Sequence, residues 1–244
     1  MAFFYLNSAE TCEIGAAFPF LKEPGHIISL VGAGGKTSLL YEMARFSASQ
    51  SLNTLVTTTT HIFKPELSVY ADDWNQVKRL WDSGSYAVVG NTVSDGKLSM
   101  LPQEKLYQWI EQADLVLIEA DGSKRMPVKV PGRNEPVILP ESDIIIGVLG
   151  ISALNRPLRN VCFRLEQAMD VLKIDADSSF TEIHAAQILS SELGTRKYVG
   201  QRFYMAVLNQ CDYGEKRKQG ERILELLARK GIPGVMSCFK GDSI

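Results

Sequence analysis

The segment that decides the fold reads HIISLVGAGGKTSLLYEMARFSAS and occupies residues 26–49. Its first six residues form an apolar run, which predicts a buried strand over residues 26–31. A glycine-rich turn follows, and apolar residues then recur at helical spacing over residues 37–49, which predicts an amphipathic helix. A strand that passes through a glycine-rich turn into a helix indicates the first unit of an α/β fold.

The same alternation continues along the rest of the chain. Further apolar runs predict strands at residues 53–57, 87–90, 115–119, 144–149, 203–208 and 235–238. Helical patterns lie near residues 72–81, 102–112 and 212–230. Strands that alternate with helices predict a three-layer α/β fold with a mostly parallel sheet, of the P-loop NTPase type.

Two segments interrupt this alternation. Residues 122–140 contain four prolines and four cations, so we expect a long irregular loop with a functional role. Residues 151–200 contain helical patterns near 161–172 and 181–193 and no strand pattern. We therefore expect a single domain over residues 1–244, with 151–200 as a small helical insertion.

Composition excludes several classes of protein. The net charge of −2 over 244 residues excludes a nucleic-acid binder that works by bulk charge. No two of the four cysteines form a C-x-x-C pair, which favours reduced thiols over a zinc site. The N-terminus has no basic residue before Lys22, and the longest apolar stretch, 144–154, is too short to span a bilayer. We expect a cytoplasmic protein without nucleic-acid or membrane partners.

The glycine-rich turn has the composition of a phosphate-binding loop. Its backbone N–H groups and the following helix N-terminus would cradle phosphate oxygens, while Lys36 reaches the β- and γ-phosphates and Thr37 coordinates Mg²⁺. The loop is shorter than the usual motif, with Leu30 where a glycine is expected, and resembles the ATP loop of Mur-ligase-type enzymes. The alternative is a glycine-rich turn with a chance lysine. The predicted nucleotide contacts here are Gly32, Ala33, Gly34, Gly35, Lys36, Thr37 and Ser38.

Carboxylates follow the apolar strand at 115–119. Asp121 is the first choice for supporting Mg²⁺, because the Asp121-Gly122 pair indicates the turn that leaves the strand. Glu119 is the second choice and could instead orient an attacking water. The predicted catalytic set is therefore Lys36, Asp121 and Glu119, with Thr37 and Asp121 as metal ligands. The alternative is a simple Asp-Gly turn beside a solvated glutamate.

Four threonines and a histidine leave the strand at 53–57. Ligands bind at the carboxyl edge of open α/β sheets, so Thr59, Thr60 and His61 would contact the γ-phosphate, Mg²⁺ or a second substrate. His61 could act as acid, base or ligand near neutral pH. The alternative is an ordinary strand end, since threonine favours strands.

The strand at 203–208 runs into Asn209-Gln210-Cys211-Asp212, which resembles the N-K-x-D motif of GTPases. In that motif the aspartate accepts hydrogen bonds from the guanine edge and the asparagine ties loops together. We therefore assign Asn209 and Asp212 to nucleotide binding, although Gln210 stands where the motif has lysine. The alternative is that Asp212 caps the following helix.

Taken in order, these motifs resemble the YqeC family of accessory proteins for selenium-dependent molybdenum hydroxylases. The resemblance runs from about residue 15 to the C-terminus and rests on GAGGKT at 32–37, VTTTTH at 56–61, IEADGSK at 118–124, EPVI at 135–138, IGVLG at 146–150 and LNQCD at 208–212.

The resemblance implies a phosphate-loop maturation factor that uses ATP or GTP with Mg²⁺. Its implied partners are a molybdenum hydroxylase, or the cofactor or selenium donors of that enzyme. Lys124, Arg125 or Arg133 could neutralise charge on the transferred phosphoryl group. Two other functions stay open, a nucleotide-gated chaperone without catalysis and a small-molecule kinase or ligase.

Overall fold

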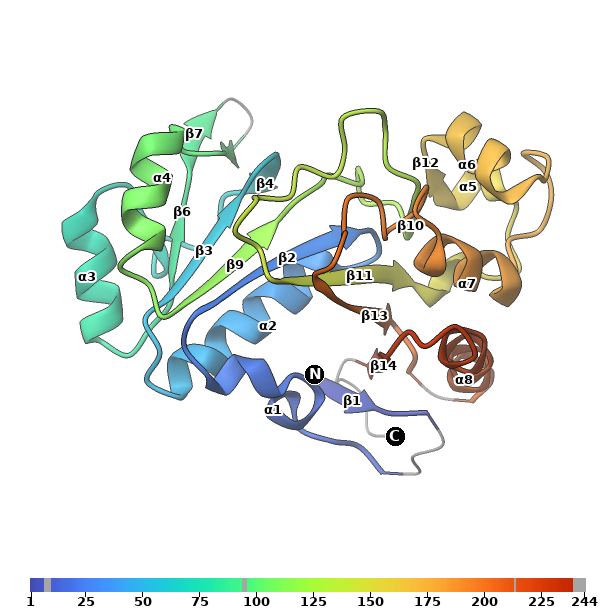
Figure 1. The fold of residues 1–244 in the computed structure, drawn as a ribbon, viewed down its shortest axis with the longest axis horizontal. Coiled ribbons are helices and arrows are strands. Elements are labelled where there is room, and N and C mark those ends of the chain that lie inside the picture. The colour runs from blue at the N-terminus through green and yellow to red at the C-terminus, as the bar shows by residue number, and fades with distance from the viewer. Residues whose placement is uncertain (7–9, 94–95, 213, 239–244) are drawn as a thin grey trace.

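The computed structural model describes residues 1–6, 10–93, 96–212 and 214–238. Its centre is a nine-stranded sheet in the order β1-β14-β13-β11-β2-β9-β3-β6-β5, in which β1 alone runs antiparallel to its neighbour (Figure 1). The strands are β1 (Ala2–Phe4), β2 (His26–Gly32), β3 (Thr54–Thr58), β5 (Tyr70–Ala71), β6 (Ala87–Val89), β9 (Leu115–Glu119), β11 (Ile144–Gly150), β13 (Phe203–Asn209) and β14 (Gly234–Cys238). The predicted mostly parallel sheet is confirmed.

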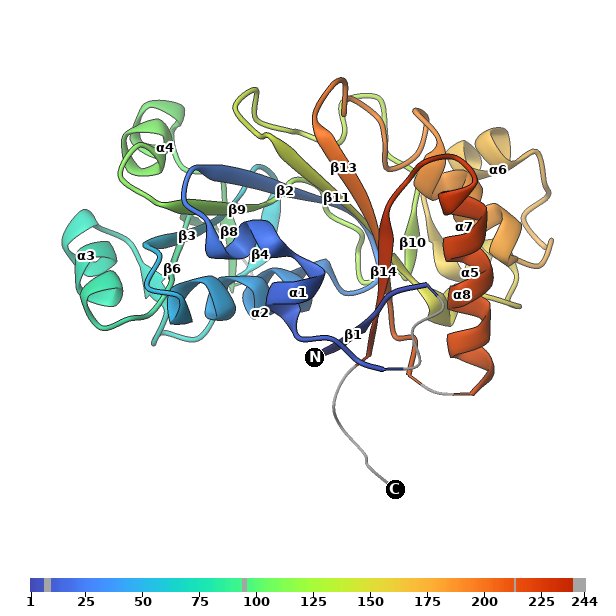
Figure 2. The same ribbon diagram turned by 60° about the horizontal axis from the view of Figure 1, so that its bottom comes forward.

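Helices cover both faces of this sheet. On one face, α1 (Ile14–Ala17) and α2 (Lys36–Ser49) pack on alternate residues of the central strands, such as Ile28, Leu117 and Ile146. On the other face, α3 (Trp74–Asp82) and α4 (Gln103–Ile110) cover one end of the sheet. At the opposite end of that face lie α6 (Leu165–Leu172), α7 (Glu182–Ser190) and α8 (Glu215–Ala228) (Figures 1 and 2). These three layers follow from strands that are buried on both sides.

The register of the central strands brings the sequence motifs to one edge. β2 pairs with β9 so that Leu30 faces Glu119, and β9 pairs with β3 so that Glu119 faces Thr58. On the other side of β2, β11 and β13 end together at Gly150 and Asn209. All of these strands are parallel, so their carboxyl ends form a single edge at which residues from four motifs can meet.

Several short strands were not predicted. A separate antiparallel sheet contains β4 (His61–Phe63), β8 (Lys97–Ser99) and β7 (Asn91–Val93), in that order. In addition, β10 (Val128–Lys129) pairs in parallel with β12 (Cys162–Phe163). The expectations of a wholly irregular 122–140 loop and of a strandless 151–200 segment are therefore wrong at these positions. Two- and three-residue strands are too short to show a hydrophobic period.

The segment 151–200 otherwise has the predicted helical character. It contains a short 3₁₀ turn at Ile151–Ala153, α5 (Leu158–Val161), α6 and α7. The helix expected at 161–172 begins only at Leu165, because the chain first forms β12. None of the helices in the described residues is both long enough and apolar enough to cross a membrane.

Candidate functional site

A cleft of 1420 Å³ opens at the carboxyl edge of the sheet, where the loop after β2 meets the segments that follow β3 and β9. The turn at 34–38 forms its floor, the β4–β8–β7 sheet forms one wall, and residues 122–127 form another. Side chains from the beginning of the helical segment, Arg156 and Phe163 among them, complete it. The cleft therefore collects chain segments that are far apart in the sequence.

The glycines of the turn are required by its shape. Gly34 has a φ of +78°, and a Cβ atom added there would lie 2.1 Å from the backbone nitrogen of Gly150. Gly35 has a φ of +104° and precedes the first residue of α2. L side chains rarely adopt these backbone angles, so glycine lets the loop curl tightly against β11. Residues 34–38 line the cleft, whereas Gly32 and Ala33 lie in the buried strand end behind it.

Lys36 folds back over its own loop. Its Nζ donates to the carbonyl oxygen of Gly32 at 2.5 Å and lies 3.0 Å from Oδ1 of Asp121. The lysine side chain is only 3% exposed. The Gly32 carbonyl and the Asp121 carboxylate thus hold the Lys36 ammonium group against the loop.

Thr37 contacts Glu119, the second-choice carboxylate, whereas the predicted metal ligands were Thr37 and Asp121. The Thr37 hydroxyl donates to Oε2 of Glu119 at 2.6 Å, and both residues line the cleft. Burial raises the pKa of Glu119, although the Lys36 charge and the Thr37 hydrogen bond act in the opposite direction. A buried carboxylate with a raised pKa is a frequent feature of functional sites.

Asp121, the first choice from the sequence for supporting Mg²⁺, does not line the cleft. Both of its oxygens lie 3.1 Å from the backbone nitrogen of Gly32, and the residue is 1% exposed. Asp121 contacts the glycine-rich turn from behind and is absent from the cleft lining, whereas Glu119 is part of the lining. The structure thus brings both carboxylates to the loop, with Glu119 on the open side.

Asp121 begins a chain of ion pairs that the sequence did not reveal. Lys129, whose side chain is fully buried, lies 3.2 Å from Asp121 and 2.7 Å from Glu135. Arg164 in turn makes two hydrogen bonds to Glu135, at 2.8 and 3.1 Å. Burial favours the neutral form of Glu135, but the hydrogen bonds from Arg164 and Lys129 outweigh it and lower its pKa to about 2. The network joins the glycine-rich turn to the loop at 122–140.

The threonine run divides its side chains between the cleft and the fold. Thr60 and His61 line the cleft, and His61 is exposed at the start of β4. Thr59 does not line it, because its hydroxyl donates to the carbonyl of Val137 at 2.6 Å. Thr58 donates to the carbonyl of Glu119 at 2.9 Å. The run therefore braces neighbouring strands and loops and presents only its last two residues to a ligand.

Asn209 connects the end of β13 to the glycine-rich turn at residues 32–37. Its Nδ2 donates to the carbonyl of Gly34 at 2.9 Å, and its Oδ1 accepts from the Ser237 hydroxyl at 2.5 Å. Gln210 follows with a φ of +68° and lines the cleft, and its buried Oε1 has no hydrogen-bond partner among the described residues. This orphaned acceptor was not predicted as a site residue.

Asp212 lies outside the cleft lining and pairs with Lys216 at 3.3 Å. The alternative that Asp212 caps the next helix is wrong, because α8 begins at Glu215 after Gly214. Asp212 therefore lies close after the end of β13, and its ion pair is with Lys216 of α8, not with the glycine-rich turn.

The cations of the 122–140 loop also separate into two groups. Lys124 and Arg125 line the cleft, whereas Arg133 does not; its carbonyl accepts hydrogen bonds from Lys197 and Tyr198. Lys97, Arg156 and Arg164 line the cleft as well and were not predicted. Lys97 lies far in the sequence from Arg156 and Arg164, so only the tertiary fold assembles the three cations, and no local motif marks them.

No group of three or more His, Cys, Asp or Glu side chains within the described residues could hold a metal ion. A divalent cation at this edge would instead share Thr37 and Glu119 with phosphate oxygens and water, which is how Mg²⁺ is usually held beside a nucleotide. The donor set fits that chemistry, since Mg²⁺ prefers oxygen ligands and keeps several waters.

Comparison with known proteins gives a consistent result. A family model described as YqeC protein matches residues 28–166, which include the turn, the threonine run, both carboxylates and the loop at 122–140. The chain is also 32% identical over 184 residues to an Escherichia coli K12 protein whose printed name is "Uncharacterized protein YqeC". That alignment covers 72% of this chain and 72% of the relative.

Proposed function

Because the chain belongs to the YqeC family, we propose that it is a P-loop NTPase-like protein that assists the maturation of selenium-dependent molybdenum hydroxylases. In this proposal it binds ATP or GTP together with Mg²⁺ and hydrolyses the nucleotide. The observation that carries the proposal is the 2.6 Å hydrogen bond from Thr37 to Glu119, directly beside a glycine loop and Lys36. The maturation role rests on the family resemblance alone.

The phosphate groups would lie over the turn at 34–38. The backbone N–H groups at the start of α2 and the partial positive charge of that helix terminus favour an anion there. Lys36 would exchange its contact with the Gly32 carbonyl for a phosphate oxygen. The phosphates would thus meet one charged side chain and a set of fixed dipoles, an arrangement that stabilises charge as it develops.

Glu119 is the carboxylate that we assign to Mg²⁺, in place of the first choice from the sequence. It faces the cleft and already contacts Thr37, while Asp121 is enclosed by Gly32, Lys36 and Lys129. Bound Mg²⁺ would supply charge neutralisation between the phosphates. Asp121 would act indirectly, since it positions Lys36 and fixes the Gly32 amide.

Asn209 would hold the loop in place from below, through the Gly34 carbonyl. The proposed reading of a base by Asp212 requires that its carboxylate release Lys216, which is 3.3 Å away and half exposed. Both ATP and GTP are therefore candidate ligands.

A second candidate, phosphoryl transfer to a small molecule, is favoured by the size of the cleft. A typical ligand pocket holds about 300–1,000 Å³. The 1420 Å³ found here exceeds that range and leaves room for an acceptor beside the nucleotide.

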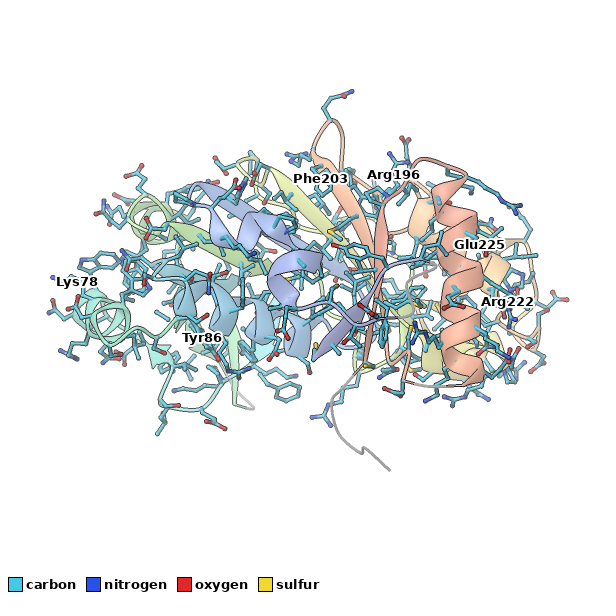
Figure 3. The ribbon with its side chains drawn as sticks, turned by 90° about the horizontal axis from the view of Figure 1, so that it is seen from below. Lys78, Tyr86, Arg196, Phe203, Arg222 and Glu225 are labelled. Atoms are coloured by element: carbon cyan, nitrogen blue, oxygen red, sulfur yellow. The ribbon has the colours of Figure 1, made fainter. Side chains whose placement is uncertain are left out.

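The test is calorimetric titration of the full chain with non-hydrolysable analogues of ATP and GTP in the presence of Mg²⁺. Lys36→Ala should weaken binding of the preferred analogue by about tenfold or more, because hydrogen bonds to charged groups contribute roughly 1.5–3 kcal/mol. Lys78→Ala is the matched control: this exposed lysine lies on α3, at the opposite end of the molecule from α8 (Figure 3). Undiminished affinity in Lys36→Ala, or no binding by the unaltered protein, would defeat the proposal.

A further inference from the structure

Two phenylalanine rings form part of the cleft wall away from the phosphate loop. Phe63 belongs to β4 and is 50% exposed, and Phe163 ends β12. The hydrophobic effect gives no reason to leave a phenylalanine half in water on a three-residue strand. Such rings on a cleft wall provide flat surfaces on which a planar molecule can stack.

Cations lie directly over both rings. The Arg125 guanidinium is 4.8 Å from the centre of the Phe63 ring, and Nζ of the adjacent Lys124 is 5.2 Å from the centre of Phe163. Arg164 approaches the same Phe163 ring at 5.1 Å, and Lys97 approaches Phe63 at 5.4 Å. Two consecutive residues thus reach two different rings, so the rings flank a single cationic surface.

Most of these cations lack an acidic partner. Within the part of the chain that the structure describes, no ion pair forms at Lys97, Lys124, Arg125 or Arg156, all of which line the cleft. Arg164 alone among the cations on this wall is paired, with Glu135. Because unpaired cations repel one another in a shared cavity, an anion that enters the cleft is attracted.

The backbone is strained where these side chains are attached. Lys124, Arg125, Arg164 and Gln210 all line the cleft and all have positive φ angles, of 48°, 64°, 66° and 68°. The left-handed conformation is unfavourable for a residue with a Cβ atom. Strain of this kind concentrates at ligand sites, and here it aims three cations into one cavity.

We propose that this wall, which we call the ring wall and define by Phe63, Phe163, Lys124, Arg125 and Arg156, binds a second ligand that is both planar and anionic. The proposal deepens the proposed function, on which it rests, because it gives the acceptor of the second candidate a chemical class: an aromatic or heteroaromatic ring that carries a phosphate or a comparable anion. The planar part would stack on the half-exposed Phe63 ring, and the cations would hold the charged part.

The place of β4 in the fold separates Phe63 from a base pocket at β13. Phe63 follows β3, which lies two strands from β2 on one side of the sheet, whereas Asn209 ends β13, two strands from β2 on the other side. Phe163 lies nearer to β13, because β12 pairs with β10 and β10 packs against β11. A nucleotide bound at residues 34–38 with its base toward β13 would leave the Phe63 side of the ring wall to another molecule.

The test uses flavin mononucleotide and 1-naphthyl phosphate as planar anionic probes. Their binding is followed by fluorescence anisotropy, with and without saturating AMP-PNP or GMP-PNP and Mg²⁺. Riboflavin supplies the ring without the phosphate, and inorganic phosphate supplies the charge without the ring. We expect at least one probe to saturate below about 1 mM, and riboflavin and phosphate each to bind at least about tenfold more weakly.

Variants connect this binding to the named residues. Phe63→Ala and Arg125→Ala should each weaken binding of the probe by about threefold or more, because each substitution removes an aromatic or cation–π contact. Lys78→Ala should leave it unchanged. Circular dichroism of each variant shows whether the fold is intact. Phe63→Leu keeps a large apolar side chain at this position while it removes the aromatic ring.

Each outcome decides one of the two proposals. If both nucleotide analogues bind but neither probe saturates, the ring wall is refuted and the nucleotide function stands. If the analogues displace the probe, the rings hold the nucleotide's own base and the second-ligand proposal is overturned. If no nucleotide binds but a probe does, with loss in Arg125→Ala, the nucleotide function fails and the ring wall stands.

Discussion

Lys129 offers the sharpest test of how the site is held together. Its side chain is fully buried and joins three groups: Asp121 at 3.2 Å, Glu135 at 2.7 Å and the carbonyl of Gly122 at 2.7 Å. Lys129→Met keeps a long unbranched side chain but removes the charge and the donors. Both carboxylates would then depend on a single cation each.

The expected cost follows from these contacts. Removing one partner of a buried ion pair usually costs about 3–5 kcal/mol, because the other charge stays buried. Asp121 keeps Lys36 and Glu135 keeps Arg164, so we expect the lower end, about 3 kcal/mol. For a chain of this size that loss lowers the melting temperature by about 6–12 °C.

The assay is urea unfolding at neutral pH, followed by tryptophan fluorescence and far-ultraviolet circular dichroism. The matched control is Lys124→Met, an exposed lysine of the same loop without an ion pair among the described residues, which should change the free energy of unfolding by less than about 0.5 kcal/mol. A loss below about 1 kcal/mol for Lys129→Met would refute the view that the ion-pair chain holds the loop.

The same variant has a predicted pH dependence. The folded pKa of Glu135 is lowered to about 2 from 4.5, so the stability that ionised Glu135 contributes is fully present above pH 4.5 and is lost as pH falls through about 2. The difference in the free energy of unfolding between the unaltered protein and Lys129→Met should therefore decrease as the pH falls from 4.5 to about 2. A difference that stays constant from pH 6 down to about 2.5 would show that the Glu135 contact is not responsible.

Two further predictions concern the floor of the cleft. Gly34→Ala should abolish nucleotide binding in calorimetry and lower stability, because the new Cβ would lie 2.1 Å from the Gly150 nitrogen at a φ of +78°; full binding would contradict the loop geometry. Glu119→Gln should weaken Mg²⁺-dependent nucleotide binding. It should also raise the melting temperature at pH 8, because burial raises the pKa of Glu119 and disfavours its ionised form. This gain in melting temperature should vanish by about pH 4, and a gain seen only at low pH would contradict the prediction.

The sequence predicts the sheet well because the central strands are long and buried on both faces. All of the predicted strands are present, and β2 with α2 fall within one residue of their expected bounds. The short strands β4, β10 and β12 escape prediction, since two or three residues carry no period and depend on partners far away in the chain.

The candidate site divides along the same line. Lys36 and Thr37 were predicted from local spacing, because a phosphate-binding loop needs a strand, a turn and a helix in order, and both residues line the cleft. Which of Glu119 and Asp121 meets Thr37 was not predictable from the sequence. Residues two positions apart along a strand and its extension point to the same face, so the choice depends on the register of β9 with β2. Phe163 and Arg156 carry no motif and reach the cleft only through the fold.

The ion-pair chain behind the glycine-rich turn contains three cations, Lys36, Lys129 and Arg164, and two carboxylates, Asp121 and Glu135. Its surplus is a single positive charge, and Lys36 is the cation at the end of the chain that faces the turn. When Lys36 turns toward a ligand, the four remaining charges balance, and Asp121 still has Lys129 and the Gly32 amide. If Lys36 binds an anion as proposed, its departure would therefore leave Asp121 and Glu135 balanced by Lys129 and Arg164.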